Sequence, residues 1–189
     1  MILWRTKLHL PEEQVDEVIS SIKLQCAEYG GQYSTYNTNP RPESIFIDTY
    51  MEVLANAAKA MGLYHRSSYR NIMWAQLYIN GGQHAIHDHS GGYLGFSWVH
   101  FVKPTSSKCF HFVDSMSNKT YPDQDAGDFI VFPQWAQHAV DPNNTMDERF
   151  VIAGNILITE LLKDDPVNPL KFITTTIPNS ITVSQHISL

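Results

Sequence analysis

The chain has 189 residues, of which 43% are hydrophobic and 17% are charged, and its formal charge at neutral pH is −6. This length allows one domain with a substantial core. The acidic balance argues against nucleic-acid binding, which needs basic surface to neutralise phosphates. No apolar run approaches the ~20 residues that span a membrane, and the first residues lack the apolar segment of a secretory signal.

The two cysteines, Cys26 and Cys109, lie far apart in the sequence. They indicate neither a disulfide framework nor a cysteine-based zinc site. We therefore expect a cytoplasmic protein, either bacterial or, if phage-encoded, located in the host cytoplasm. We expect neither nucleic acid nor membrane as a partner, and the composition leaves the oligomeric state open.

Residues 1–68 are expected to support the fold with two helices. Proline suits the first helical turn, so Pro11 is expected to open a helix, and Gly30 and the glycine after it are expected to stop it. A second helix is expected to use Asp48 or Thr49 as its cap and to end near Gly62. Apolar residues at helical spacing on both helices indicate packing against a core.

From residue 69 onward the hydrophobic period changes to two. In the segment 71–80 the odd positions are apolar, whereas the even positions Trp74, Gln76 and Tyr78 carry polar atoms. Such a strand turns one face to the core and the other to a pocket. A loop is expected at 33–44, further strands at 3–9, 84–89, 93–102, 108–114, 127–133 and 149–159, and an extended tail or edge strand at 165–189.

Many short strands punctuated by turns favour a sandwich or barrel over a parallel sheet with alternating helices. The sequence therefore predicts a mainly β fold of the α+β class. We expect a single domain with helical support at 1–68, a β core at 69–160 and a C-terminal extension at 161–189.

Histidines gather in the middle of the chain around the tripeptide His87-Asp88-His89, which lies between two glycine pairs. Side chains at i and i+2 of a strand share a face, so His87 and His89 would form half of a site for iron or zinc. His138, just beyond the apolar strand 129–132, is the best candidate for a third ligand. Alone, it would more simply pack beside Trp135.

Arg149 begins the apolar run RFVIAGNILI, and by strand parity it shares a face with Val151, Ala153 and Asn155. The small side chains after the arginine would leave space for a ligand. A guanidinium is suited to grip a carboxylate through two parallel hydrogen bonds. The alternative is an internal salt bridge with Glu148 or Asp147.

Taken in order, these segments resemble the iron(II)- and 2-oxoglutarate-dependent dioxygenases, particularly the small prolyl-4-hydroxylase-like group of bacteria and phages. The resemblance covers residues 69–158. It rests on the aromatic strand at 74–78, the histidines and glycines at 84–95, FHFVD at 110–114, GDFIVFPQWAQHAV at 127–140 and ERFVIAGN at 148–155.

The resemblance implies a double-stranded β-helix, or jelly roll, with iron held in its mouth. It places His87 and His138 in the two histidine-ligand positions, and Arg149 in the position that binds the distal carboxylate of 2-oxoglutarate. The implied cofactors are Fe(II), 2-oxoglutarate and O2. The implied reaction is hydroxylation of an unactivated C–H bond in a peptide or small molecule, such as a prolyl residue or a free amino acid, with release of succinate and CO2.

The chain departs from the family pattern at two positions. Most members have a carboxylate as the middle ligand, in the motif His-x-Asp, whereas here the same-face position is His89. Asp88 is one residue out of phase, and only a bulge would turn it inward. We therefore prefer His87, His89 and His138 as metal ligands and keep Asp88 as the alternative to His89. The second departure is Val151, which lies two residues after the arginine, where the family often has a hydroxyl-bearing side chain. Valine cannot supply the hydrogen bond of that hydroxyl.

Other polar residues receive weaker roles. Tyr78 and Gln76 are predicted to hydrogen-bond the cosubstrate, and Asn155 to orient a ligand on the pocket face. We expect His84, His100 and His111 to be structural or surface residues. Two other functions stay open: a cupin-like metalloenzyme without 2-oxoglutarate, and a non-catalytic metal-dependent binding or sensor module. Arg149 separates the 2-oxoglutarate-dependent oxygenase from the cupin-like enzyme, because only the former gives it a necessary partner. A binding or sensor module would bind metal tightly without oxygen-dependent conversion of 2-oxoglutarate to succinate.

Overall fold

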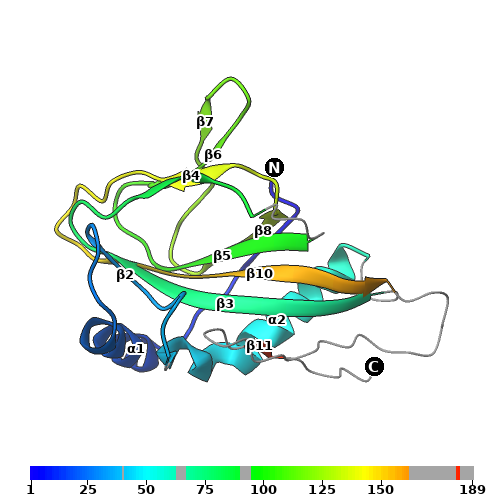
Figure 1. Ribbon diagram of the computed structural model, residues 1–189, viewed down its shortest axis with the longest axis horizontal. Coiled ribbons are helices and arrows are strands. Elements are labelled where there is room, and N and C mark those ends of the chain that lie inside the picture. Colours follow the sequence, from blue (N-terminus) through cyan, green and yellow to red (C-terminus); the bar gives the residue numbers. More distant parts are fainter. Residues whose placement is uncertain (40, 63–66, 90–94, 162–181, 184–189) are drawn as a thin grey trace.

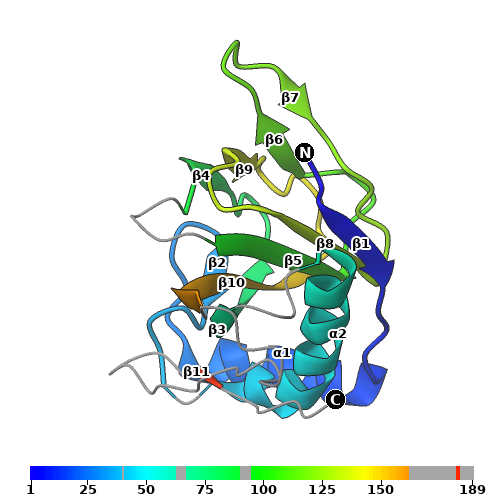
Figure 2. The same cartoon turned by 90° about the vertical axis from the view of Figure 1, so that its right-hand side faces the viewer.

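Two antiparallel β-sheets face each other, and two helices cover the outer face of the larger sheet (Figures 1 and 2). The computed structural model describes residues 1–39, 41–62, 67–89, 95–161 and 182–183, to which all structural statements below refer. The predicted strand at 93–102 and the C-terminal extension lie partly outside these residues.

The larger sheet has the strand order β1-β8-β5-β10-β3-β11, and β2 also pairs with β3. The smaller sheet has the order β4-β9-β6-β7. The larger sheet consists of β1 (Trp4–Lys7), β2 (Gln32–Ser34), β3 (Ser67–Tyr78), β5 (Gly95–Lys103), β8 (Asp128–Pro133), β10 (Arg149–Leu161) and β11 (Thr182–Val183). The smaller sheet consists of β4 (His84–His87), β6 (Phe110–Val113), β7 (Lys119–Thr120) and β9 (His138–Val140).

From β3 to β10 the chain passes repeatedly from one sheet to the other, which is the path of a jelly roll. β3, β5, β8 and β10 lie in the larger sheet, and β4, β6 and β9 lie between them in sequence but in the smaller sheet. The fold predicted from the sequence is therefore confirmed. The β6–β7 hairpin projects away from the body of the molecule (Figure 1).

The helices are α1 (Glu12–Gln25) and α2 (Ile47–Ala60), the second preceded by the short 3₁₀ helix η1 (Pro42–Phe46). Two predictions about their ends are wrong. α1 ends at Gln25, before the glycine pair, and α2 continues from the 3₁₀ turn without a side-chain cap, so Asp48 and Thr49 lie in its first turn. Neither helix is long and apolar enough to cross a membrane.

The predicted loop at 33–44 overlaps β2 at its start and η1 at its end, and the short strands β7 and β9 were not expected. β2 is polar, yet it pairs with the end of β3. Backbone hydrogen bonds hold such an edge strand whatever its side chains, so hydrophobic periodicity cannot reveal it.

Two apolar cores lie on opposite faces of the larger sheet. The first packs α1 and α2 against that sheet through residues such as Ile22, Leu54 and Trp98, and the second fills the space between the sheets around Phe101 and Phe132. The alternation expected along β3 is confirmed: Met73, Ala75 and Leu77 belong to the first core, whereas Trp74, Gln76 and Tyr78 line a cavity on the other face.

The close packing of β10 on Trp98 gives a test of the first core. A Cβ added at Gly154 would lie 2.5 Å from the backbone oxygen of Ile72 and 2.5 Å from the Trp98 ring. Because neither group can move freely, Gly154→Ala should destabilise the protein by about 1–3 kcal/mol, the usual cost of overpacking. Thermal or denaturant unfolding measures this loss. Ala153→Ser, whose side chain faces the cavity, is the control, and an equal effect of both substitutions would contradict the packing.

Candidate metal centre

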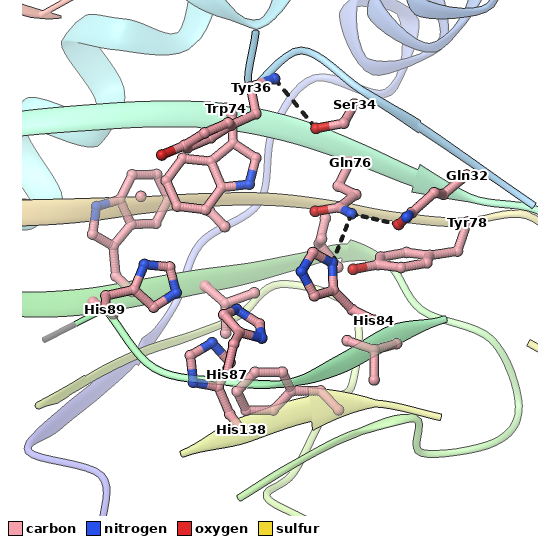
Figure 3. A pocket seen from close by; sticks show the side chains of 18 of the residues that line it. Gln32, Ser34, Tyr36, Trp74, Gln76, Tyr78, His84, His87, His89 and His138 are labelled. Carbon is pink, nitrogen blue, oxygen red and sulfur yellow. Dashed lines mark hydrogen bonds between the residues drawn. The ribbon is translucent and has the colours of Figure 1, made fainter. Parts of the chain in front are cut away.

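A cavity of about 460 Å³ opens between the two sheets, within the size range of small-molecule sites. β2 and β3 form one wall, β4 and β9 form the facing wall, and alternate residues of β10 line its base. Opposite Trp74 and Gln76, on the β4–β9 side, lie the labelled side chains of His84, His87, His89 and His138 (Figure 3). The face shared by Arg149, Val151 and Ala153 belongs to this cavity, as strand parity predicts.

His87 and His138 are brought together by antiparallel pairing. They are direct partners in the β4–β9 register, and their ring centroids are 4.2 Å apart. Each ring lies with Nδ1 2.8 Å from a backbone carbonyl, that of Ala85 for His87 and that of Ala136 for His138. A carbonyl only accepts, so Nδ1 must donate and carry the proton. In the neutral rings Nε2 is then unprotonated and available to a metal.

His89 completes the group although it lies beyond the end of β4. Its ring centroid is 5.1 Å from that of His87 and 5.1 Å from that of His138. Its backbone N–H donates to the Gln134 carbonyl at 2.8 Å, and its ring stacks on Trp74 with centroids 6.1 Å apart.

His87, His89 and His138 each offer a nitrogen that lies within 4.8 Å of the others, so the three side chains could hold one metal ion between them. Asp88 is exposed and is not part of this group, although it also borders the cavity.

Burial keeps the imidazoles of His89 and His138 neutral. Desolvation, with smaller contributions from neighbouring imidazoles, lowers the pKa of His89 to about 4. Desolvation also lowers the pKa of His138 to about 3, against the opposing effect of the Ala136 carbonyl. Neutral imidazole is the form that binds metals, so neither His89 nor His138 has to lose a net proton before it binds an ion at neutral pH.

His84 was expected to be a structural or surface residue, but it is a fourth histidine that lines the cavity. Strand parity places residues i and i+3 on opposite faces, but a register irregularity between His84 and His87 brings both rings to the cavity, with centroids 4.4 Å apart. The Gln76 amide nitrogen lies 3.3 Å from Nδ1 of His84 and 2.7 Å from the Gln32 side-chain oxygen. The amide donates, so neutral His84 carries its proton on Nε2 and is a hydrogen-bond donor rather than a ligand.

Arg149 is 2% exposed and lies in the wall of the same cavity. Its guanidinium lies over the rings of Tyr78 and Phe101, 5.1 Å and 5.9 Å from their centroids, and its Nη1 has no hydrogen-bond partner among the described residues. Burial lowers the pKa of Arg149, but a guanidinium keeps its charge in proteins.

No carboxylate of the described residues forms an ion pair with Arg149, and Glu148 pairs instead with Lys23 at 2.6 Å. The internal salt bridge considered for Arg149 is therefore not what the structure shows. The guanidinium is a buried charge that faces a cavity, and burial without a counter-ion is costly. An anionic ligand would supply the missing partner.

The remaining predicted cosubstrate residues are placed differently from one another. Tyr78 lies beside Arg149, and burial raises the pKa of its phenol to about 12 despite the nearby positive charge, so it is a permanent donor. Gln76 is on the cavity wall with its amide nitrogen engaged by Gln32 and His84. Asn155 contacts His89 rather than open space, with its amide nitrogen 2.9 Å from Nδ1.

No protein-family model and no curated protein sequence matches this chain. Solved structures, however, match most of its length. A prolyl-4-hydroxylase from Pseudomonas putida superimposes with a TM-score of 0.58 at 13% identity over 82% of this chain and 91% of that one. A 2OG-Fe(II) oxygenase family protein from Burkholderia pseudomallei gives a TM-score of 0.62 at 11% identity over 84% and 85%.

The chain has the fold of the 2-oxoglutarate–Fe(II) oxygenases. A further match, HygX from Streptomyces hygroscopicus with nickel, 2-oxoglutarate and hygromycin B bound, has a TM-score of 0.61 at 10% identity over 82% of each chain. The structural relationship agrees with the family resemblance drawn from the sequence.

The hydrogen bonds of the imidazoles predict which histidines bind a metal. Replacing His87 or His138 by alanine should weaken Co(II) binding by at least about 100-fold, more than the ~10–100-fold typical of losing an outer partner. His84→Ala should leave Co(II) affinity unchanged, because the Gln32 side-chain oxygen holds the Gln76 amide in the orientation that keeps the proton of His84 on Nε2. Titration followed by visible absorption or calorimetry measures these constants.

The same titration separates the two candidates for the middle position. His89→Ala should lower Co(II) affinity, and Asp88→Ala should not. The reverse result would show that the chain turns Asp88 inward when metal binds. Loss of affinity in His84→Ala would contradict the proton assignment of that ring.

Proposed function

We propose that this protein is an Fe(II)- and 2-oxoglutarate-dependent oxygenase that hydroxylates an unactivated C–H bond. The observation that carries the proposal is the buried guanidinium of Arg149, which has no carboxylate partner among the described residues and borders the same cavity as the group of His87, His89 and His138. A metal site alone fits many activities. A metal site that shares its cavity with a buried arginine lacking a counter-ion is suited to a ligand that chelates the metal and also carries a carboxylate for the arginine.

The donor set fits Fe(II). Imidazole nitrogen is a suitable ligand for iron, and His87 and His138 present unprotonated Nε2 atoms because their Nδ1 atoms donate to carbonyls. Three protein ligands leave positions open for cosubstrate and oxygen, whereas a closed four-ligand site would not. In this proposal His89 occupies the third position.

The other end of the cavity fits the distal carboxylate of 2-oxoglutarate. Arg149 offers two parallel N–H donors, and the Tyr78 phenol beside it adds an O–H donor. Val99 and Val151 line the space with apolar side chains that suit the methylene carbons of the cosubstrate. Val151 donates no hydrogen bond, so Arg149 and Tyr78 would hold the carboxylate.

Bound Fe(II) would supply the oxygen chemistry. In the overall reaction one oxygen atom of O2 ends in succinate, formed from 2-oxoglutarate with release of CO2, and the other is inserted into a substrate C–H bond. The residues of this chain bind, orient and exclude water. Phe110, Phe132 and Val140 form an apolar wall close to His138, and Arg149 fixes the cosubstrate from the far end.

Substrate would reach the site past an aromatic wall. Tyr36 is 49% exposed and meets Trp74 edge to face, with centroids 5.1 Å apart, and Trp74 in turn stacks on His89. The segment 32–37, which includes β2, contributes Gln32, Ser34, Tyr36 and Asn37 to the lining of the cavity. The proposed substrate is a small molecule or a peptide, such as a prolyl residue or a free amino acid.

The first test of this function is spectroscopic. Anaerobic addition of Fe(II) and 2-oxoglutarate should produce a weak visible metal-to-ligand charge-transfer band, because the cosubstrate chelates the metal. Exposure to O2 should then convert 2-oxoglutarate to succinate. Iron bound without the band would favour a metalloenzyme that does not use 2-oxoglutarate, and a band without succinate would favour a binding or sensor module.

The second test isolates the arginine. Arg149→Ala should raise the 2-oxoglutarate concentration required by about 30-fold or more, since leaving a buried charged partner unpaired costs ~2–5 kcal/mol. Iron affinity should remain unchanged, because Arg149 is not a ligand. Arg5→Ala, at a half-exposed arginine of β1, is the control. An unaltered 2-oxoglutarate requirement in Arg149→Ala would overturn the assignment.

A further inference from the structure

The environment of His89 differs from that of the other two histidines of the metal group. His87 and His138 place Nδ1 against backbone carbonyls, which only accept. Nδ1 of His89 lies 2.9 Å from the side-chain amide nitrogen of Asn155, which only donates. With the amide in this orientation, the proton of neutral His89 resides on Nε2.

Because Nδ1 of His89 is engaged by Asn155, Nε2 is the nitrogen left for a metal, and a protonated Nε2 has no in-plane lone pair to donate. In this arrangement two imidazoles of the group are ready to act as ligands and the third is a donor. Conversion of His89 into a ligand requires its proton to move to Nδ1, and Nδ1 then needs an acceptor in place of the Asn155 amide nitrogen.

Asn155 can supply that acceptor without any change of backbone. Rotation of its amide by half a turn exchanges oxygen and nitrogen, which places Oδ1 opposite Nδ1–H of His89. The other end of the amide is held by Ser97, whose hydroxyl donates to Oδ1 at 2.8 Å. A hydroxyl can donate or accept, so Ser97 satisfies the amide in either orientation.

The His89 ring is otherwise fixed in place. Trp74 stacks against it with an interplanar angle of 19°, and its backbone N–H donates to the Gln134 carbonyl. Asn155 and Ser97 are both buried and face each other directly in the β10–β5 register. The ring position is therefore set by packing, and the amide orientation is the variable that remains.

We propose that Asn155, supported by Ser97, is a positioning residue that sets the tautomer of His89 through the orientation of its amide and so decides whether this imidazole is a metal ligand. The inference rests on the proposed metal site but not on the use of 2-oxoglutarate. Metal binding would be accompanied by transfer of the His89 proton from Nε2 to Nδ1 and by rotation of the Asn155 amide, with no net change in protonation.

Nitrogen NMR of the imidazoles reads the tautomer directly. With ¹⁵N-labelled histidine and diamagnetic Zn(II), metal-free protein should show His89 protonated at Nε2, and Zn(II)-loaded protein should show it protonated at Nδ1. His87 and His138 should be protonated at Nδ1 in both states. His89 protonated at Nε2 in the Zn(II)-loaded protein, or at Nδ1 in both states, would overturn the proposal.

Two substitutions at the same position separate tautomer control from simple packing. Asn155→Asp provides an acceptor in either orientation and should bind Co(II) at least as tightly as the wild type. Asn155→Leu provides no acceptor and should weaken Co(II) binding by about 10–100-fold, as expected for an outer partner of a ligand. Equal behaviour of the two variants would contradict the proposal, because a packing role does not distinguish an acceptor from a hydrocarbon.

Asn71→Leu is the matched control. Asn71 is also a buried asparagine of the larger sheet, but its side-chain oxygen accepts from the Trp98 indole on the helix-facing side. This variant should retain wild-type Co(II) affinity whatever its loss of thermal stability. If Asn155→Leu does not fold, the NMR measurement on the wild-type protein decides between tautomer control and simple packing.

Neither measurement uses 2-oxoglutarate. A wild-type protein that shows the tautomer change but forms no succinate would refute the proposed reaction and support this inference. Succinate formation by Asn155→Leu with unaltered Co(II) affinity would do the opposite.

Discussion

A buried positive charge without a fixed counter-ion is the constraint around which the cavity is built. Desolvation of a charged group is costly unless it is paired, yet Arg149 is almost wholly enclosed and no described carboxylate pairs with it. The faces of Tyr78 and Phe101 offset part of this cost through cation–π contacts. The jelly roll keeps the remaining side open to a cavity, and an anion that enters it completes the electrostatics.

The imidazoles at the other end of the cavity are differentiated by what their Nδ1 atoms meet. Carbonyls two residues upstream accept from Nδ1 of His87 and His138 and leave Nε2 free in the neutral rings, whereas the Gln76 amide donates to Nδ1 of His84 and leaves the proton on its Nε2. Histidine side chains in the same cavity therefore present two kinds of nitrogen, an unprotonated Nε2 that can bind a metal and a protonated Nε2 that can donate a hydrogen bond. His89, held by an amide that can turn, is the one ring whose role the surrounding hydrogen bonds leave adjustable.

The sequence predicted those parts of the site that depend on strand parity and failed where parity is broken. The two faces of β3 and the shared face of Arg149, Val151 and Ala153 follow from a period of two, and both are as predicted. His84 was missed because a register irregularity moves it onto the face of His87, and no residue in that segment marks the irregularity.

Other errors have a different physical origin. β9 has only three residues, and β2 is polar and held through its backbone, so neither produces a hydrophobic pattern. The contact between His89 and Asn155 joins residues 66 positions apart. It depends on the path of the chain after the end of β4, which the sequence does not specify. Long-range side-chain pairing of this kind is fixed by tertiary packing alone.

The charge balance of the proposed site links its unusual features to one another. A carboxylate in the middle position would cancel part of the charge of Fe(II), whereas three neutral imidazoles leave the full double positive charge to attract ligands. Dianionic 2-oxoglutarate would neutralise that charge, and Arg149 would remain as a single positive charge at the far end. The stronger attraction of the metal end for the cosubstrate would then offset the hydrogen bond that Val151 cannot make. In this account the histidine at position 89 and the valine at position 151 are complementary departures, one adding electrostatic affinity where the other removes a polar contact.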